Sequence, residues 1–326
     1  MSSDCERHIQ RQREILAAHP EIRQYFCNTP LSIVPIALLV IAQWSIASIV
    51  SNMPWWAIGL SALLCGQFIR HALFVFVHEA AHRRILKSKS GNRMVLFLIE
   101  IGALSFGETL KYVSAHAPSH HNHLNDYYRD FGWLDRCQVD NFLAKPLWRC
   151  FEAFLHLLPG GPLLGSFLMN RLGGQDTRRY IEQHPFSIAF QYFLMATSLS
   201  LYVLAWQFLG WGAALYLFWS ISIFSGYWGI TAQGETIAEH NVCSNGGTFS
   251  TYGWINLFLF NVGYHDEHHT FPQVSWMYLP KVHALASKSF QESDGGKSYF
   301  GWWWQWMRSG FKPEKSHRYE VEIQAS

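Results

Sequence analysis

The chain has 326 residues, of which 49% are hydrophobic and only 15% are charged, and its formal net charge is +2. Soluble domains carry roughly 25% charged residues, so this composition argues against a soluble class, and the absence of a basic cluster argues against a nucleic-acid partner. The six cysteines are scattered without any Cys-x-x-Cys pair, which excludes a disulfide scaffold.

Residues 1–24 are polar and charged, so we expect no cleavable signal peptide at this end. Two long segments then lack Asp, Glu, Lys and Arg altogether: residues 24–69 and residues 183–234, which are 46 and 52 residues long. A membrane crossing needs about 20 apolar residues, so each segment can hold a helical hairpin. The predicted spans are residues 31–51, 55–77, 186–207 and 211–232.

The basic residues predict the orientation of these hairpins. Residues 1–30, 78–185 and 233–326 hold 4, 13 and 7 Lys and Arg residues, and Arg70 is the remaining one. Because basic residues favour the cytoplasmic side, we expect an integral, multi-pass membrane protein with both termini and the central loop in the cytoplasm. Arg70 lies inside the second predicted span, so we expect it to face the bundle interior or to snorkel.

Two shorter apolar stretches occur outside the four spans. Met94–Phe106 is too short to cross a bilayer, and Phe151–Met169 is interrupted by Pro and Gly residues. We predict that both are interfacial or re-entrant helices on the cytoplasmic side. The tryptophans at positions 302–306 indicate another contact with the membrane interface.

Histidines carry the chemistry of this sequence. Three motifs stand out: His78-Glu-Ala-Ala-His82, His116-Ala-Pro-Ser-His120-His121 and His265-Asp-Glu-His268-His269. Residues three or four apart share one helix face, so paired imidazoles can converge on an ion. With His240 after the fourth span, the candidate ligands number nine, which is enough for two metal ions: His78, His82, His116, His120, His121, His240, His265, His268 and His269. Imidazole suits iron, zinc, copper and nickel alike.

Two other functions are compatible with parts of this pattern. His78-Glu79-x-x-His82 fits the HExxH motif of zinc proteases, in which the glutamate is the general base. That function leaves the other histidine motifs unexplained. A histidine-rich metal transporter would need ionisable residues inside the spans, which contain only Arg70 and His71.

At its histidine motifs the sequence resembles the membrane-bound fatty acid desaturase superfamily, and within it the sphingolipid delta-4 (dihydroceramide) desaturase branch. The likeness covers roughly residues 10–290 and rests on three stretches: Arg11–Arg23, Ile237–His240 and Asn261–Pro272. The first of these looks like the amphipathic N-terminal segment of that branch. The second motif has one residue more than the usual His-x2-His-His, so His123 is an alternative ligand to His116.

The resemblance implies one all-α membrane domain over residues 1–326, with four transmembrane helices in two hairpins and a cytosolic helical cap formed by residues 78–185 and 233–326. It also implies that the nine histidines hold two iron ions. O2 is then the co-substrate, a separate cytochrome b5 or ferredoxin supplies electrons, and a lipid or lipid-like amphiphile is desaturated. Hydroxylation, and desaturation of a small natural product such as dihydrorhizobitoxine, remain open within the superfamily.

Overall fold

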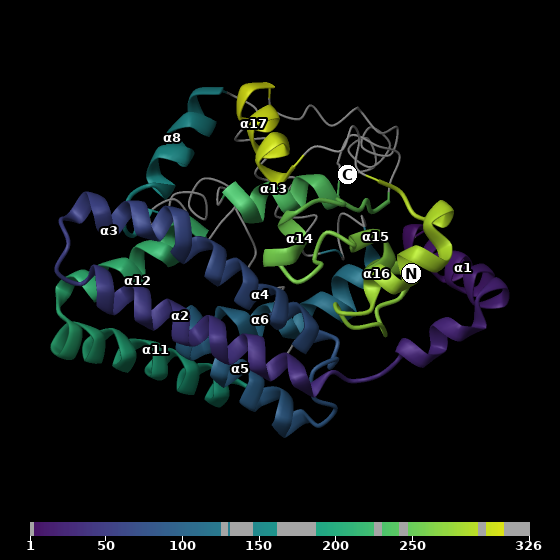
Figure 1. Cartoon of the computed structure of the whole chain (residues 1–326), viewed down its shortest axis with the longest axis horizontal. Helices are drawn as coiled ribbons and strands as arrows, with labels where there is room; N and C mark the ends of the chain where they lie inside the picture. The colour runs from purple at the N-terminus through teal and green to yellow at the C-terminus, as the bar shows by residue number, and fades with distance from the viewer. Residues whose placement is uncertain are drawn as a thin grey trace, which may run out of the picture.

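The computed structural model describes residues 3–124, 130, 146–161, 187–224, 230–240, 247–292 and 298–309. Every regular element in these residues is a helix, and one isolated bridge pairs Ser250 with Glu292 (Figure 1). The all-α class that the resemblance implied is therefore confirmed over the described residues.

Three helices are long and apolar enough to cross a membrane. The first runs over Pro30–Val50 and consists of η2 (Pro30–Ser32) and α2 (Ile33–Val50). The second, Trp55–Ala81, joins α3 (Trp55–Ser61), the π-helical turn η3 (Ala62–Gly66) and α4 (Gln67–Ala81). The third is α11 (Ile188–Leu209). All three match predicted spans to within about four residues.

The fourth predicted span is only partly covered. Helix α12 (Trp211–Phe224) begins at the predicted residue but is shorter than a full crossing. Residues 225–229 lie outside the described part of the chain, and α13 (Ile230–Glu239) follows them. A fourth complete crossing therefore stays a prediction.

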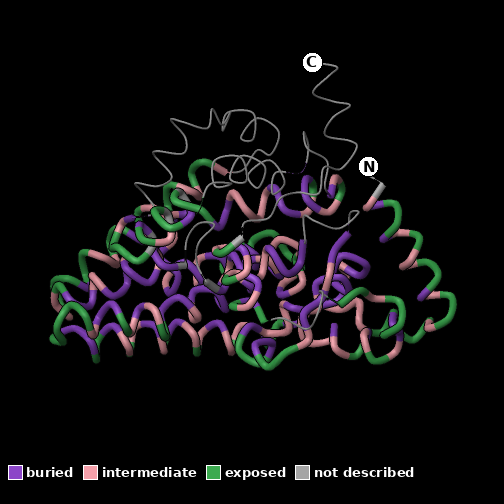
Figure 2. The backbone as a smooth tube through the Cα atoms, turned by 90° about the horizontal axis from the view of Figure 1, so that it is seen from above, coloured by how far each residue is buried: buried purple, intermediate pink, exposed green. Residues whose placement is uncertain are grey.

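The outward faces of the long helices are apolar. Only 28% of the most apolar window of the first span and 17% of that of α11 are buried inside the protein. Figure 2 shows exposed positions recurring along these helices, and they include Leu38, Ile41 and Leu199. An apolar surface of this extent is unfavourable in water and suits contact with lipid tails.

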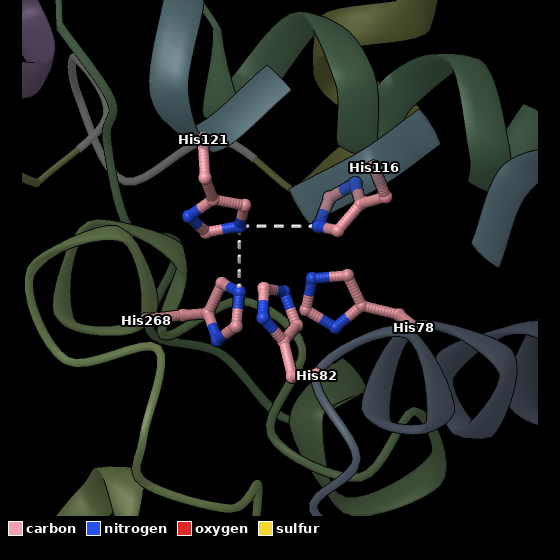
Figure 3. Close-up of side chains that lie close together, drawn as sticks. All are labelled: His78, His82, His116, His121 and His268. Carbon is pink, nitrogen blue, oxygen red and sulfur yellow. Dashed lines mark hydrogen bonds between the residues drawn. The ribbon is translucent and has the colours of Figure 1, made fainter. Parts of the chain in front are cut away.

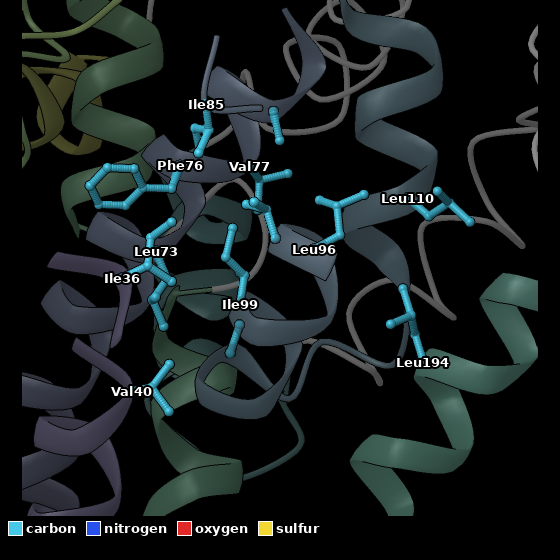
Figure 4. Close-up of a cluster of buried hydrophobic side chains, with 13 residues drawn as sticks. Ile36, Val40, Leu73, Phe76, Val77, Ile85, Leu96, Ile99, Leu110 and Leu194 are labelled. Atoms are coloured by element: carbon cyan, nitrogen blue, oxygen red, sulfur yellow. The ribbon is translucent and has the colours of Figure 1, made fainter. Parts of the chain in front are cut away.

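Helix α5 (Lys89–Ala103) packs against both α2 and α4. Its buried Val95, Leu96 and Ile99 join Leu73 and Val77 of α4 in one apolar cluster (Figure 4). The Met94–Phe106 stretch, which we expected to be interfacial or re-entrant, thus buries one face in the bundle. The second such stretch, Phe151–Met169, begins within α8 (Pro146–His156). Its residues from 162 onward lie outside the described part of the chain, so the expectation for it stays a prediction.

Arg70 faces the bundle interior, which was one of the two orientations expected for it; the other was snorkelling. Its side chain is 1% exposed, and its Nη2 donates to the carbonyl oxygen of Leu217 on α12 at 2.7 Å. The tryptophans at both helix connections, Trp55, Trp56, Trp206 and Trp211, are exposed.

Most of the remaining helices gather at the end of the bundle opposite the α2–α3 and α11–α12 connections (Figure 1). They are α1 (Ser3–Ala18), η1 (Pro20–Tyr25), α6 (Glu108–Ala115), η4 (His116–His121), α14 (Ile255–Phe258), α15 (His265–Thr270), α16 (Leu279–Ala286) and η5 (Ser287–Ser289). Helix α17 (Tyr299–Ser309) instead packs against α13 and α8. All three histidine motifs are at this end. The first lies on the last turn of α4, which reaches it, and the other two form η4 and α15.

Candidate metal centre

The first histidine motif lies on the last turn of α4. The sequence predicted a span ending near residue 77, but the helix continues through Ala80 and Ala81, and Ala is the best helix former. His82 closes the helix and Arg83 follows it with a positive φ of 53°. His78 and His82 therefore stand one turn apart on one face, with their ring centroids 5.1 Å apart.

The second motif forms η4, a π-helical turn. In an α-helix, His116 and His120 would share one face, because they are four residues apart. A π-helix is wider than an α-helix, with hydrogen bonds from residue i to residue i+5, and in this turn His116 faces His121 instead. The Nε2 atoms of His116 and His121 are 3.1 Å apart, whereas His120 lies beside His240 and His269. The π-turn thus divides the second motif between two places.

The third motif is α15, a helix of six residues. His265 and His269 are four residues apart and face His240, whose Nε2 lies 2.9 Å from the Nε2 of His265. His268 lies on the other side, with its Nε2 3.2 Å from the Nε2 of His121.

These contacts divide the nine predicted ligands into two groups, with none left over. The nitrogen atoms of each group lie within 4.8 Å of one another. Site I consists of His78, His82, His116, His121 and His268, and Figure 3 shows their rings turned toward a common centre. Site II consists of His120, His240, His265 and His269. His123 belongs to neither site, so the geometry favours His116 as the ligand.

The chemistry of both groups fits a bound metal ion. The Nε2 atoms of His82 and His269 are buried and have no hydrogen-bond partner in the described residues, which is costly unless something else binds them. Burial, with neighbouring imidazoles as the next cause, holds the pKa of His82, His116, His121, His268 and His269 well below the ordinary value. A metal-binding imidazole must be neutral, and a lowered pKa favours the neutral form.

Two carboxylates contact histidines of site II on the side away from the other ligands, and the sequence analysis predicted neither of them. Glu239 lies 3.2 Å from Nδ1 of His265, and Asp130 lies 3.0 Å from Nδ1 of His120. Such carboxylates fix the ring direction and leave Nε2 to face the metal. The position of Glu239 directly before His240 is a weak indication in the sequence. Asp130 follows its histidine by ten residues and could not have been found without the fold.

Glu79 does not take part in either group, although it lies between two of the ligands in the sequence. Its carboxylate accepts hydrogen bonds from Ser275 Oγ at 2.7 Å and from the backbone N–H of Trp276 at 3.3 Å. A zinc protease needs this glutamate beside the metal to activate water. The orientation of Glu79 therefore does not favour a protease.

Histidines outside the motifs mostly have structural partners. His19 pairs with Glu21, His283 lies 2.6 Å from Glu267, and the buried His71 pairs with Glu235 of α13. The ring of His8 packs 5.5 Å from the ring of His269, so His8 lies beside site II. The sequence had given no reason to connect His8 with the site.

Comparison with known proteins gives the same family as the histidine motifs. Residues 54–303 match the family described as fatty acid desaturase. The chain is 30% identical to a sphingolipid delta(4)-desaturase DES1-like protein of Oryza sativa subsp. japonica, over 91% of this chain and 84% of that protein. It is 29% identical to human sphingolipid delta(4)-desaturase DES1, over 87% of this chain and 82% of that protein.

No solved structure matches the chain significantly. The family match nevertheless covers well over half of the chain, and the relatives align over most of their own length. The chain belongs to the fatty acid desaturase family, on its sphingolipid delta-4 branch.

Proposed function

We propose that this protein is an O2-dependent di-iron desaturase that introduces a C=C bond into the alkyl chain of a lipid or lipid-like amphiphile. The observation that carries the proposal is the pair of all-histidine groups, sites I and II, next to one another at one end of an apolar helical bundle. The names of the relatives make sphingolipid long-chain bases the first substrates to test.

The nine imidazoles would hold the two iron ions, and Asp130 and Glu239 would orient His120 and His265 from behind. Bound iron would supply the activation of O2 that removes two hydrogens from adjacent carbons. The reaction consumes O2, two electrons and two protons for each double bond and forms two waters. A separate donor of the cytochrome b5 or ferredoxin type would provide the electrons.

The proposed architecture is a single membrane domain over residues 1–326. Four spans form two hairpins, with α12 beginning the fourth, and the helices around sites I and II form a cytosolic cap. Both termini and all three histidine motifs then face the cytoplasm, which agrees with the distribution of basic residues.

A hydroxylase of the same superfamily would use the same ligands, because both reactions begin with removal of a hydrogen from the chain. A small amphiphile such as dihydrorhizobitoxine is an alternative substrate. Neither alternative has a specific observation in its favour, and the orientation of Glu79 speaks against the protease.

Product analysis tests the proposal. Mass spectrometry of lipids from a host that expresses the protein should show a loss of two hydrogens, whereas an added oxygen would indicate a hydroxylase. Purified protein should hold about two irons and little zinc. His268→Ala removes a ligand from site I and His269→Ala one from site II, and each should abolish the product while the protein still inserts. His19→Ala, outside both sites, is the matched control. A fully active, iron-free preparation would overturn the di-iron assignment.

A further inference from the structure

The N-terminal helix α1 lies against the third histidine motif, although more than 240 residues separate them in the sequence (Figure 1). Arg11 forms a two-pronged ion pair with Asp266: Nη1 donates to Oδ2 at 2.7 Å and Nη2 donates to Oδ1 at 2.8 Å. Asp266 is fully buried. Paired contacts of this kind fix orientation as well as position.

His8 makes a second connection one turn before Arg11. Its Nδ1 accepts from Nη2 of Arg11 at 2.9 Å and lies 3.1 Å from Oγ1 of Thr270, and its Nε2 lies 3.2 Å from Oγ1 of Thr248. Thr248 in turn donates to Asp266 at 2.7 Å. His8, Arg11, Asp266 and Thr248 thus form a closed ring of polar contacts beside the ring of His269.

Helix α1 holds α15 at both ends. Arg11 binds Asp266 near its beginning, and Nε2 of Gln12 donates to the carbonyl oxygen of Thr270, its last residue, at 2.7 Å. These contacts fall on either side of His268 and His269, and the first of them, at Asp266, directly follows His265.

A helix as short as α15 needs such external support. Isolated helices shorter than about 12 residues are marginal in water, and α15 has only six residues. The two acidic residues between its histidines are both anchored: Asp266 by α1, and Glu267 by the hydroxyls of Ser250 and Tyr252 and by His283. Since α15 supplies ligands to both sites, any rotation of it would misplace imidazoles in both.

We propose that α1 is part of the metal centre, with Arg11 and His8 acting as positioning residues that set the directions of His265, His268 and His269. This inference rests on the proposed metal-dependent function. It also gives a role to the Arg11–Arg23 stretch, which by its amphipathic character alone could be taken for a membrane-surface segment.

The test compares variants of the full-length protein loaded with Co²⁺ or iron. Arg11→Ala should lower kcat about 10- to 100-fold, the usual cost of losing an outer partner of a metal ligand, with little change in the KM for the lipid. The Co²⁺ ligand-field absorption bands should shift at equal metal content. Arg11→Lys keeps the charge but not the two-pronged geometry, so it should retain more activity than Arg11→Ala.

The His8 variants test the second connection. His8→Phe should shift the Co²⁺ bands, and His8→Gln should shift them less. Because Arg11→Ala could fail to fold, the milder Arg11→Lys and His8→Gln carry the test in that event.

Arg13→Ala is the matched control, because Arg13 is exposed on the same helix. If Arg11→Ala and His8→Phe keep the kcat and the Co²⁺ bands of Arg13→Ala, the inference is wrong. The metal readout separates this failure from failure of the proposed function. Shifted bands in a protein whose wild type desaturates no lipid would leave the positioning role standing and overturn the desaturase proposal. An active wild type whose variants show unshifted bands would support the desaturase proposal and overturn the positioning role of α1.

Discussion

At the scale of single residues, Glu79 separates a desaturase from a zinc protease. Glu79→Gln should retain bound metal and substantial activity. The glutamine Oε1 can still accept the hydrogen bonds that Ser275 and Trp276 donate, and the carboxylate faces away from site I. The measurement is product formation and metal content of the purified variant.

The control for Glu79→Gln is His78→Ala, one residue away on the same helix, which should lose activity. Complete loss of activity in Glu79→Gln with the metal retained would be the behaviour of a general base. That result would reopen the protease hypothesis.

The buried imidazoles also predict how the metal-free protein responds to acid. The pKa of His82, His116, His121, His268 and His269 is lowered by burial, whereas in the unfolded chain each has its ordinary value near 6.5. Below pH 6.5 the unfolded state therefore binds more protons than the native state, so the free energy of unfolding falls as the pH falls. Each histidine contributes up to about 1.4 kcal/mol per pH unit.

Thermal unfolding of metal-free protein in detergent between pH 7.5 and 5.5 measures this dependence. The midpoint should fall on acidification, and His268→Ala should reduce the slope by removing one such group. His19→Ala, outside both sites, is the control for the substitution itself. A flat profile for the wild type would contradict neutral, buried ligands.

That these nine histidines gather at one place could be predicted from the sequence, but their division into two groups could not. The motifs are recognisable by spacing alone, because His78 and His82 lie one helical turn apart. The separation of His120 from His121 depends on the π-turn η4, and no residue pattern in the sequence indicates one. Adjacent residues His268 and His269 likewise serve different sites, which only the orientation of α15 decides.

At the scale of elements, the close approach of η3 and α12 depends on Gly66, the last residue of η3. A Cβ at this position would lie 2.0 Å from Oγ and 2.7 Å from Cβ of Ser220. Gly66→Ala should therefore lower the stability of the protein, and overpacking of this kind typically costs about 1–3 kcal/mol. The measurement is the thermal midpoint of the purified variant in detergent.

Gly253 provides the matched control for Gly66, since a Cβ there would meet nothing within 4 Å. Gly253→Ala should keep the wild-type midpoint. Changing Ser220 to Gly in the Gly66→Ala background should recover part of the loss by removing the clashing side chain. Equal midpoints for Gly66→Ala and Gly253→Ala would show that the two helices can separate without cost.

Helix ends and partners were less predictable than helix positions. Hydropathy located the three long helices, because a crossing requires a long apolar stretch. It could not show that the second one continues to Ala81, since histidine and glutamate are polar wherever they occur. Nor could it place α1, whose contact with α15 joins distant parts of the chain through Arg11 and Asp266.

At the scale of the whole molecule, sites I and II combine ligands from both halves of the chain. His78 lies at the end of the first pair of apolar helices, whereas His268 follows the second pair. They can meet only if both halves end on the same side of the membrane. The basic residues predict this arrangement. The fold places the end of α4 and helix α15 away from the α2–α3 and α11–α12 connections (Figure 1), and the orientation in the membrane stays a prediction.

Cysteine labelling tests this topology. After replacement of the native cysteines, of which Cys65 and Cys150 are exposed, single cysteines are introduced at four exposed positions. Asn52→Cys and Gln207→Cys, near the two connections, should react with an impermeant thiol reagent from outside intact cells. Ser90→Cys and Lys288→Cys, beside the first and third motifs, should react only after permeabilisation.

None of these four positions is a proposed ligand, so each variant can also be checked for activity. The informative comparison is between the last two, because they report on the two halves of the metal centre independently. Labelling of Lys288→Cys from outside while Ser90→Cys stays protected would put the third motif across the membrane from the first. His268 could then not approach His78 and His82, no shared metal centre could form, and the desaturase proposal would fail with it.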